Sequence, residues 1–179
     1  MSIRLTRPGL GENVLPVSPA DVLRNLLVSA GYGTMPQAQA PPNSVWPNWP
    51  VYAFKEPETT PDNTVTIYDF PSGQQFSRNQ ITGEQQFYHG TQIIVRSVVP
   101  PEGWYAAYDL GQGLDQILDD TVIIRDREYL IHSVNRGDVI AAGSEKPSSP
   151  TKGPKSERQL FSIRAIVIGL RLFTIRSPQ

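Results

Sequence analysis

Alternation of apolar and polar residues predicts two strands near the middle of the chain. Apolar residues alternate with polar ones over residues 64–69, which is the two-residue period of a strand with one buried face. Pro71 and Gly73 end this strand, because proline cannot donate to a ladder and glycine permits positive φ. Residues 91–99 repeat the pattern. The connection of roughly twenty residues is far longer than the usual hairpin loop of about 2–5 residues, so we expect a functional loop over residues 70–90.

A short helix is predicted to begin after Ser18. Ser18 can cap the free amides, Pro19 suits the first helical position, and Asp21 complements the helix dipole. Gly31 and Gly33 supply the stop. The apolar stripe that follows at helical spacing is Val22, Leu23, Leu26, Leu27 and Ala30. Such an amphipathic helix needs a sheet to cover.

A second helix is predicted to begin at Pro101-Glu102. Its interior contains Gly111 and Gly113, each of which weakens a helix by about 1 kcal/mol relative to alanine. We therefore expect a bend or break there. The apolar residues at helical spacing are Trp104, Ala107, Leu110, Leu114, Ile117 and Leu118.

The element order predicts an α+β protein: a mixed, mostly antiparallel sheet of about five or six strands with two helices packed on it. Residues 1–17 form an N-terminal arm, and residues 18–176 form a single domain. The long loops are expected at 34–50, 70–90 and 142–157. The remaining strands are predicted at Val51–Phe54, at Thr121–Ile124, at Glu128–Asn135 after a tight turn, and at Gln159–Phe173. In the last of these, Ala165 to Ile168 are apolar on both faces, which indicates a central strand.

Composition narrows the function classes. With 179 residues, 39% hydrophobic and 18% charged, the chain resembles an ordinary single-domain protein. A net charge of −1 gives no electrostatic argument for binding nucleic acid or an anionic membrane, and no apolar run approaches the ~18–20 residues that span a bilayer. The absence of cysteine excludes disulfides and thiolate chemistry. The 17 prolines are clustered and indicate extended loops.

Candidate chemistry is sparse. Neither a Gly-x-Ser-x-Gly motif nor a phosphate loop is present, and no cofactor, metal site or enzymatic activity is predicted. His132 shares a strand face with Leu130 and Val134, which favours a hydrogen-bonded core histidine over a metal ligand. The chain has one acidic group, Asp109, Asp115, Asp119 and Asp120, and one basic group, Lys146, Lys152, Lys155 and Arg158. The acidic group is better explained as a solvated helix face than as a site for divalent-ion binding or acid–base catalysis. The basic group is better explained as a solubilising loop than as a contact with an acidic partner.

Two segments are candidates for partner contact. In loop 70–90, aromatic and arginine side chains favour an interface, although Phe87 and Tyr88 would alternatively just extend the second strand. Tryptophan is enriched at interface hot spots, so the tryptophans in the proline-rich segment 36–50 are either partner anchors or a cover for the edge of the core. The predicted interface residues are Phe76, Arg78, Asn79, Phe87, Tyr88, His89, Trp46 and Trp49.

Several segments together resemble the tail terminator (tail completion) proteins of long-tailed bacteriophages, over about residues 18 to 173. Similar proteins carry a Pro-Asp-x-x-Ile-x-x-Tyr-Asp-x-Pro-Gly segment, from which this chain departs at Ser72, and an Arg-x-x-Phe-Ser strand near the end. The resemblance assigns no role to segments 36–50 and 142–156. The residues that carry it are Trp49–Tyr52, Pro61–Gly73, Thr91–Ser97, the Leu110–Leu118 helix, Arg127–Ser133 and Arg158–Ile163.

The resemblance implies a mechanical role in the virion. Such proteins form a six-fold ring on the head-proximal end of the tail tube, stop its polymerisation and present a surface to the head–tail connector. It implies a homo-oligomer, the tail tube protein and the connector or stopper protein as partners, passage of DNA without sequence-specific binding, no membrane, and assembly in the host cytoplasm. Alternative functions are another neck component (a head-completion or stopper protein), or a small hydrolase centred on Asp109–Asp120.

Overall fold

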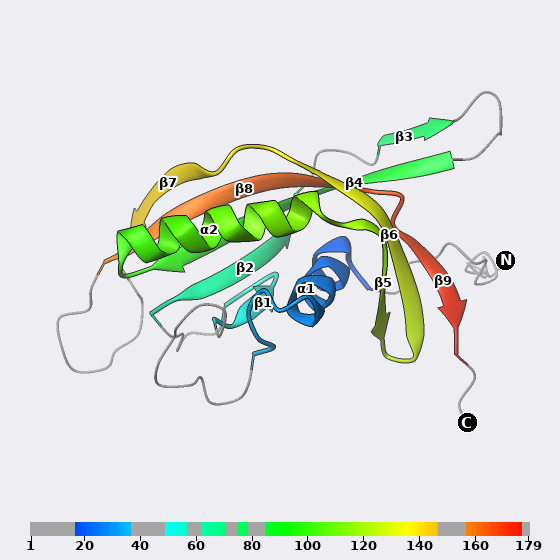
Figure 1. Cartoon of the computed structure of the whole chain (residues 1–179), viewed down its shortest axis with the longest axis horizontal. Coiled ribbons are helices and arrows are strands. Elements are labelled where there is room, and N and C mark those ends of the chain that lie inside the picture. Colours follow the sequence, from blue (N-terminus) through cyan, green and yellow to red (C-terminus); the bar gives the residue numbers. More distant parts are fainter. Residues whose placement is uncertain are drawn as a thin grey trace, which may run out of the picture.

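The computed structural model describes residues 17–36, 49–56, 62–70, 75–78, 85–146 and 157–176, with the backbone alone at 75–78, 85 and 86. Nine strands and two helices make up this part of the chain (Figure 1). The helices are α1 (Pro19–Ser29) and α2 (Pro100–Asp115). The strands are β1 (Val51–Ala53), β2 (Thr64–Asp69), β3 (Gln75–Arg78), β4 (Gln85–Ser97), β5 (Leu118–Ile124), β6 (Arg127–Arg136), β7 (Ile140–Glu145), β8 (Arg158–Ile168) and β9 (Arg171–Ile175).

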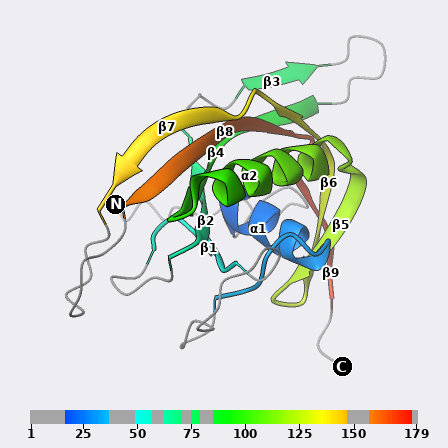
Figure 2. The ribbon, with the colours of Figure 1, turned by 60° about the vertical axis from the view of Figure 1, so that its left-hand side comes forward.

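All of these strands belong to one curved sheet, with both helices on its inner side (Figures 1 and 2). The main path runs β1-β2-β4-β8-β6-β5, while β3 pairs with β4, β7 with β8 and β9 with β6. Only β1 and β2 are parallel among these pairs. The predicted α+β class with a mixed, mostly antiparallel sheet is therefore confirmed. The main path has six strands, and three additional strands flank it.

Helix α1 begins as the sequence predicts. The Ser18 hydroxyl accepts a hydrogen bond from the Asp21 amide at 3.2 Å, and the amide of Ala20 donates to the Asp69 carboxylate at 2.9 Å. The second bond satisfies an amide that has no partner inside the helix. It also joins the start of the helix to the end of β2. Ala30, expected in the apolar stripe, is exposed at the C-cap, and the buried small residue is Ala20.

Helix α2 is continuous through Gly111 and Gly113, so the predicted break is absent. Packing explains why a helix of this length contains glycines. A Cβ on Gly113 would lie 2.4 Å from the Tyr32 ring, and one on Gly103 would lie 2.7 Å from Cβ of Ser97. Leu118, predicted at the end of this helix, belongs to β5 and is exposed.

The core lies between the helices and the inner face of the sheet. Apolar side chains from α1, α2 and the central strands are fully buried there, and β8 occupies the central position that its apolar pattern predicts. The core residues include Val22, Leu23, Leu27, Leu110 and Leu114 from the helices and Val65, Ile67, Ile93, Val95, Ile131 and Ile163 from the sheet. No helix in the described residues is long and apolar enough to cross a membrane.

Three predicted boundaries are wrong. In loop 70–90, residues 75–78 and 85–88 pair as a hairpin that projects from the body (Figure 1). The predicted loop 142–157 overlaps β7, which pairs with β8 up to Glu145. The predicted strand 159–173 is two strands, because the chain turns at Gly169, whose φ is +68°. The two missed strands consist mostly of polar or small residues, so their sequences lack the alternation that predicts a strand.

Candidate functional site

The most densely bonded polar site is a buried charge network on the outer face of the sheet. Register places Arg96 opposite Thr64 on β2 and Leu160 on β8, and β7 aligns Glu145 with Arg158. The carboxylate of Glu56, three residues after β1, lies among these side chains.

Glu56 is the centre of this network. Its Oε1 accepts from Arg96 Nη1 at 3.1 Å and from Thr66 Oγ1 at 3.0 Å, and it also accepts from Thr64 Oγ1. Its Oε2 accepts from Arg158 Nη2 at 3.1 Å. Glu145 approaches the same two arginines, at 2.9 Å from Arg96 Nε and 2.5 Å from Arg158 Nη2.

The network is balanced in charge and structural in character. The arginine side chains are 9% and 6% exposed, so two buried cations are matched by two carboxylates. Burial opposes the charge on Arg96, but Glu56, Tyr68 and Glu145 together raise its pKa above the ordinary value. Burial and Glu56 raise the pKa of the neighbouring Tyr52 phenol, while Arg158 opposes that shift. Arg158, predicted as part of a solvated basic loop, is instead this buried partner; Lys152 and Lys155 lie outside the described residues.

The residues considered for catalysis do not form one site. Asp115 forms a two-point ion pair with Arg136, at 2.6 and 3.0 Å, while Asp119 lies 2.6 Å from Nδ1 of His132. His132 was predicted in the core, but its side chain is 43% exposed: Tyr129 and Ile131 occupy the buried face of β6 instead. Within the described residues, no group of His, Asp and Glu has an arrangement that would hold a metal ion.

The predicted interface residues occupy different environments. Trp49 is 1% exposed and packs in the core, as the alternative interpretation of that tryptophan proposed. Phe87, Tyr88 and His89 are half-buried and extend β4, where Tyr88 pairs with Ile168. Phe76 and Arg78 are described only through the backbone of β3, and Trp46 and Asn79 lie outside the described residues.

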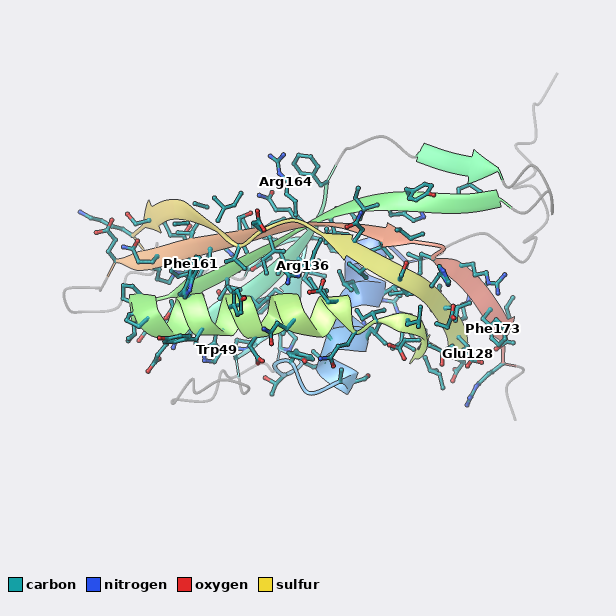
Figure 3. All side chains as sticks on the ribbon, turned by 45° about the horizontal axis from the view of Figure 1, so that its top comes forward. Trp49, Glu128, Arg136, Phe161, Arg164 and Phe173 are labelled. Atoms are coloured by element: carbon teal, nitrogen blue, oxygen red, sulfur yellow. The ribbon has the colours of Figure 1, made fainter. Side chains whose placement is uncertain are left out.

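A cleft of about 390 Å³ lies near the base of the projecting hairpin. The Arg164 guanidinium, labelled in Figure 3, lies over the Phe70 ring at 4.6 Å. This is a cation–π contact that involves the first aromatic residue of the predicted loop. Asn135 and Ile166 are among the other residues that line the cleft. Arg164 remains exposed.

Sequence analysis missed an exposed aromatic group on α2. Tyr105 is 71% exposed, Tyr108 50% and Trp104 40%. Trp104, predicted in the buried stripe, is therefore partly in solvent, and its ring centre lies 5.8 Å from that of Phe161 in a T-shaped contact. The available signal was the spacing: Glu102, Tyr105, Tyr108 and Asp109 recur at three and four residues, which places them on one helix face away from Ala107 and Leu110. We call Val99, Glu102, Trp104, Tyr105, Tyr108 and Asp109 the α2 surface.

A second exposed surface lies at the β9 end of the molecule. Phe173 and Ile175 are 52% and 55% exposed, and the Arg176 amide donates to the Asp126 carbonyl at 2.9 Å, which joins β9 to the β5–β6 turn. Positive φ at Arg125 and Asp126 makes this turn tight. The exposed residues at this end are Arg125, Arg171, Phe173, Ile175 and Arg176, of which Figure 3 labels Phe173.

Comparisons with known proteins add little to this description. No protein-family model matches the chain, and no curated protein does. Several solved chains match, among them one whose name states no function, with 16% identity over 69% of this chain and 82% of its own length and a TM-score of 0.33. A likeness at that level supports no argument about function.

Proposed function

We propose that this chain is a structural virion protein that forms a ring on the head-proximal end of a phage tail tube. The ring ends polymerisation of the tube and presents the surface that joins the tail to the head connector. In this proposal the chain is a homo-oligomer of the virion neck, its partners are the tube protein and the connector or stopper protein, and DNA passes through the ring without sequence readout. The role is mechanical and needs no cofactor or catalytic residue.

The observation that carries the proposal is the amount of large apolar surface left uncovered on a chain with a well-formed core. Soluble monomers rarely expose extended apolar patches unless these bind something. Here two aromatic residues of α2 and two apolar residues of β9 are half exposed or more at two separate places: Tyr105, Tyr108, Phe173 and Ile175. Surfaces of that kind suit a protein whose work is to contact copies of itself and neighbouring proteins.

Open strand edges give such contacts a further mechanism. In the described residues β3 pairs only with β4, β7 only with β8, and β9 only with β6. Each therefore has one edge whose backbone groups are not used by the sheet. Unpaired edges accept an added strand from a neighbour. In the proposed ring, the projecting β3–β4 hairpin reaches the tube protein or the adjacent subunit.

Electron microscopy of virions that lack this chain tests the proposal. The expected result is tails of abnormal length that are not attached to filled heads. Tailless heads, or filled heads that leak DNA, would instead assign the chain to a head-side neck component. For the hairpin, deletion of residues 74–86 should impair ring formation or tail joining while leaving the core intact. Normal rings and normal joining after this deletion would remove the hairpin from the contact.

A further inference from the structure

The cleft beside Arg164 exists because one row of residues across the outer face of the sheet has a gap. The amide of Phe70 donates to the Gly90 carbonyl at 2.9 Å. Gly90 pairs with Ile166 of β8, and Ile166 pairs in turn with Asn135 of β6. Side chains in such a row lie next to one another on one face of the sheet. Because Gly90 has no side chain, the row is hollow between Phe70 and Ile166, and all four residues line the cleft.

Arg164 brings a positive charge to this cleft that no described carboxylate neutralises. It lies two residues before Ile166 and therefore on the same face of β8, on the side of the sheet away from α2 (Figure 3). The 4.6 Å contact with the Phe70 ring restrains the guanidinium. Within the described residues, however, its N–H groups have neither an ion pair nor an oxygen acceptor.

The other polar groups of the cleft define what it can hold. Asn135 is exposed, and its carboxamide makes no side-chain hydrogen bond to another described residue. Arg136 also lines the cleft, but its Nε and Nη2 donate to Asp115 and its Nη1 donates to the Gly137 carbonyl. The cleft therefore offers one uncommitted cation and one uncommitted carboxamide between apolar walls.

We propose that this cleft binds a carboxylate carried on an apolar stem. The guanidinium fork matches the two oxygens of a carboxylate, the Asn135 carboxamide can donate a further hydrogen bond, and Phe70 and Ile166 cover the stem. The volume of about 390 Å³ is within the usual range of ligand pockets, roughly 300–1,000 Å³. A small organic acid and an acidic side chain of a partner protein share this chemistry. The inference does not depend on the proposed ring.

Calorimetric titration of the full chain with matched probes tests the site. The free acid is 3-phenylpropionate, and its neutral counterpart is 3-phenylpropionamide. The protein-borne carboxylate is the peptide acetyl-Leu-Glu-Leu-amide, and its counterpart has glutamine in place of glutamate. The variants are Arg164→Gln and Phe70→Leu, with Arg171→Gln as the control, because Arg171 is exposed and outside the cleft. Circular dichroism checks that each variant folds.

At least one of the two carboxylates should bind wild type and the control equally, and its neutral counterpart should bind about tenfold more weakly or less, because hydrogen bonds to a charged group are lost. Arg164→Gln should weaken the carboxylate by a similar factor, and Phe70→Leu, which keeps the charge, severalfold. Tighter binding of the peptide assigns the site to a partner's acidic side chain; tighter binding of the free acid assigns it to a small molecule.

Three results would overturn the proposal. They are equal affinity for a carboxylate and its neutral counterpart, unchanged affinity in Arg164→Gln, and no binding of either carboxylate at tens of millimolar at two temperatures. The proposed ring would stand after any of them, because ring formation is measured separately by electron microscopy.

Discussion

Neutralising Glu56 tests the physical account of the sheet most sharply. Its carboxylate accepts hydrogen bonds from two threonines and two arginines, and its side chain is 11% exposed. Glu56→Gln preserves size but leaves Arg96 and Arg158 to share Glu145 alone. Breaking a buried ion pair on one side costs about 3–5 kcal/mol, because the remaining charge is buried without compensation.

The lower end of that range applies here. Glu145 is 34% exposed, so water reaches one side of the network and relieves part of the unpaired charge. We expect a loss of about 3 kcal/mol, which for a chain of this size lowers Tm by roughly 6–12 °C. Urea unfolding followed by circular dichroism, at concentrations where the chain is monomeric, measures this loss.

A matched control and a double mutant complete the experiment. Glu128→Gln replaces a carboxylate that accepts an exposed hydrogen bond from the Thr174 hydroxyl and should change stability by less than about 0.5 kcal/mol. Glu56→Gln combined with Arg158→Gln should lose less than the sum of the two single changes, by about 1 kcal/mol or more. A loss below about 1 kcal/mol for Glu56→Gln alone would refute the view that this network holds β2, β4, β7 and β8 together.

Three further outcomes follow from the geometry. Burial lowers the pKa of His89 against the opposing effect of Asp69, so the folded state binds fewer protons than the unfolded state. The stability that His89 contributes is therefore complete above the unfolded pKa of about 6.5 and falls as the pH drops toward the folded pKa. His89→Gln should flatten this dependence in urea titrations at several pH values. In α2, Gly103→Ala should lower the free energy of unfolding by about 1–3 kcal/mol, because the added methyl group would lie closer to Phe161 and Ser97 than van der Waals contact allows. Gly111→Ala should raise it by up to about 1 kcal/mol, because its methyl group meets only the end of a flexible arginine. Thermal unfolding measures both changes. Asp115→Ala should change stability by less than about 1 kcal/mol and leave assembly unchanged; loss of assembly would show that this carboxylate acts beyond its half-exposed ion pair.

Sequence patterns predicted the elements that have a strong local signal. The Ser18-Pro19 start of α1, the alternation in β2 and the apolar run in β8 are each read within a single element. The register that brings Glu56 to Arg158 across 102 positions depends on strand order, which no local pattern specifies. The charge network was therefore outside the reach of sequence analysis.

The exposed aromatic residues show a different limit. Trp104 has the right spacing for the core stripe, yet it packs on Phe161 with 40% of its surface in solvent. Hydrophobicity alone does not distinguish a core residue from an interface residue. Both types are apolar side chains that become buried, the first when the chain folds and the second when it binds a partner. The strands β3 and β7 were missed for the opposite reason: their polar or small residues show no buried face.

Growth of tail tubes in the presence of the purified chain tests the central claim most directly. Tube subunits are allowed to polymerise with increasing amounts of the chain, and tube length and end structure are measured by electron microscopy. The account predicts that tubes shorten as the chain is added and that a six-fold ring occupies one end of each tube. Tubes that grow to the same length with bare ends at every concentration would contradict it.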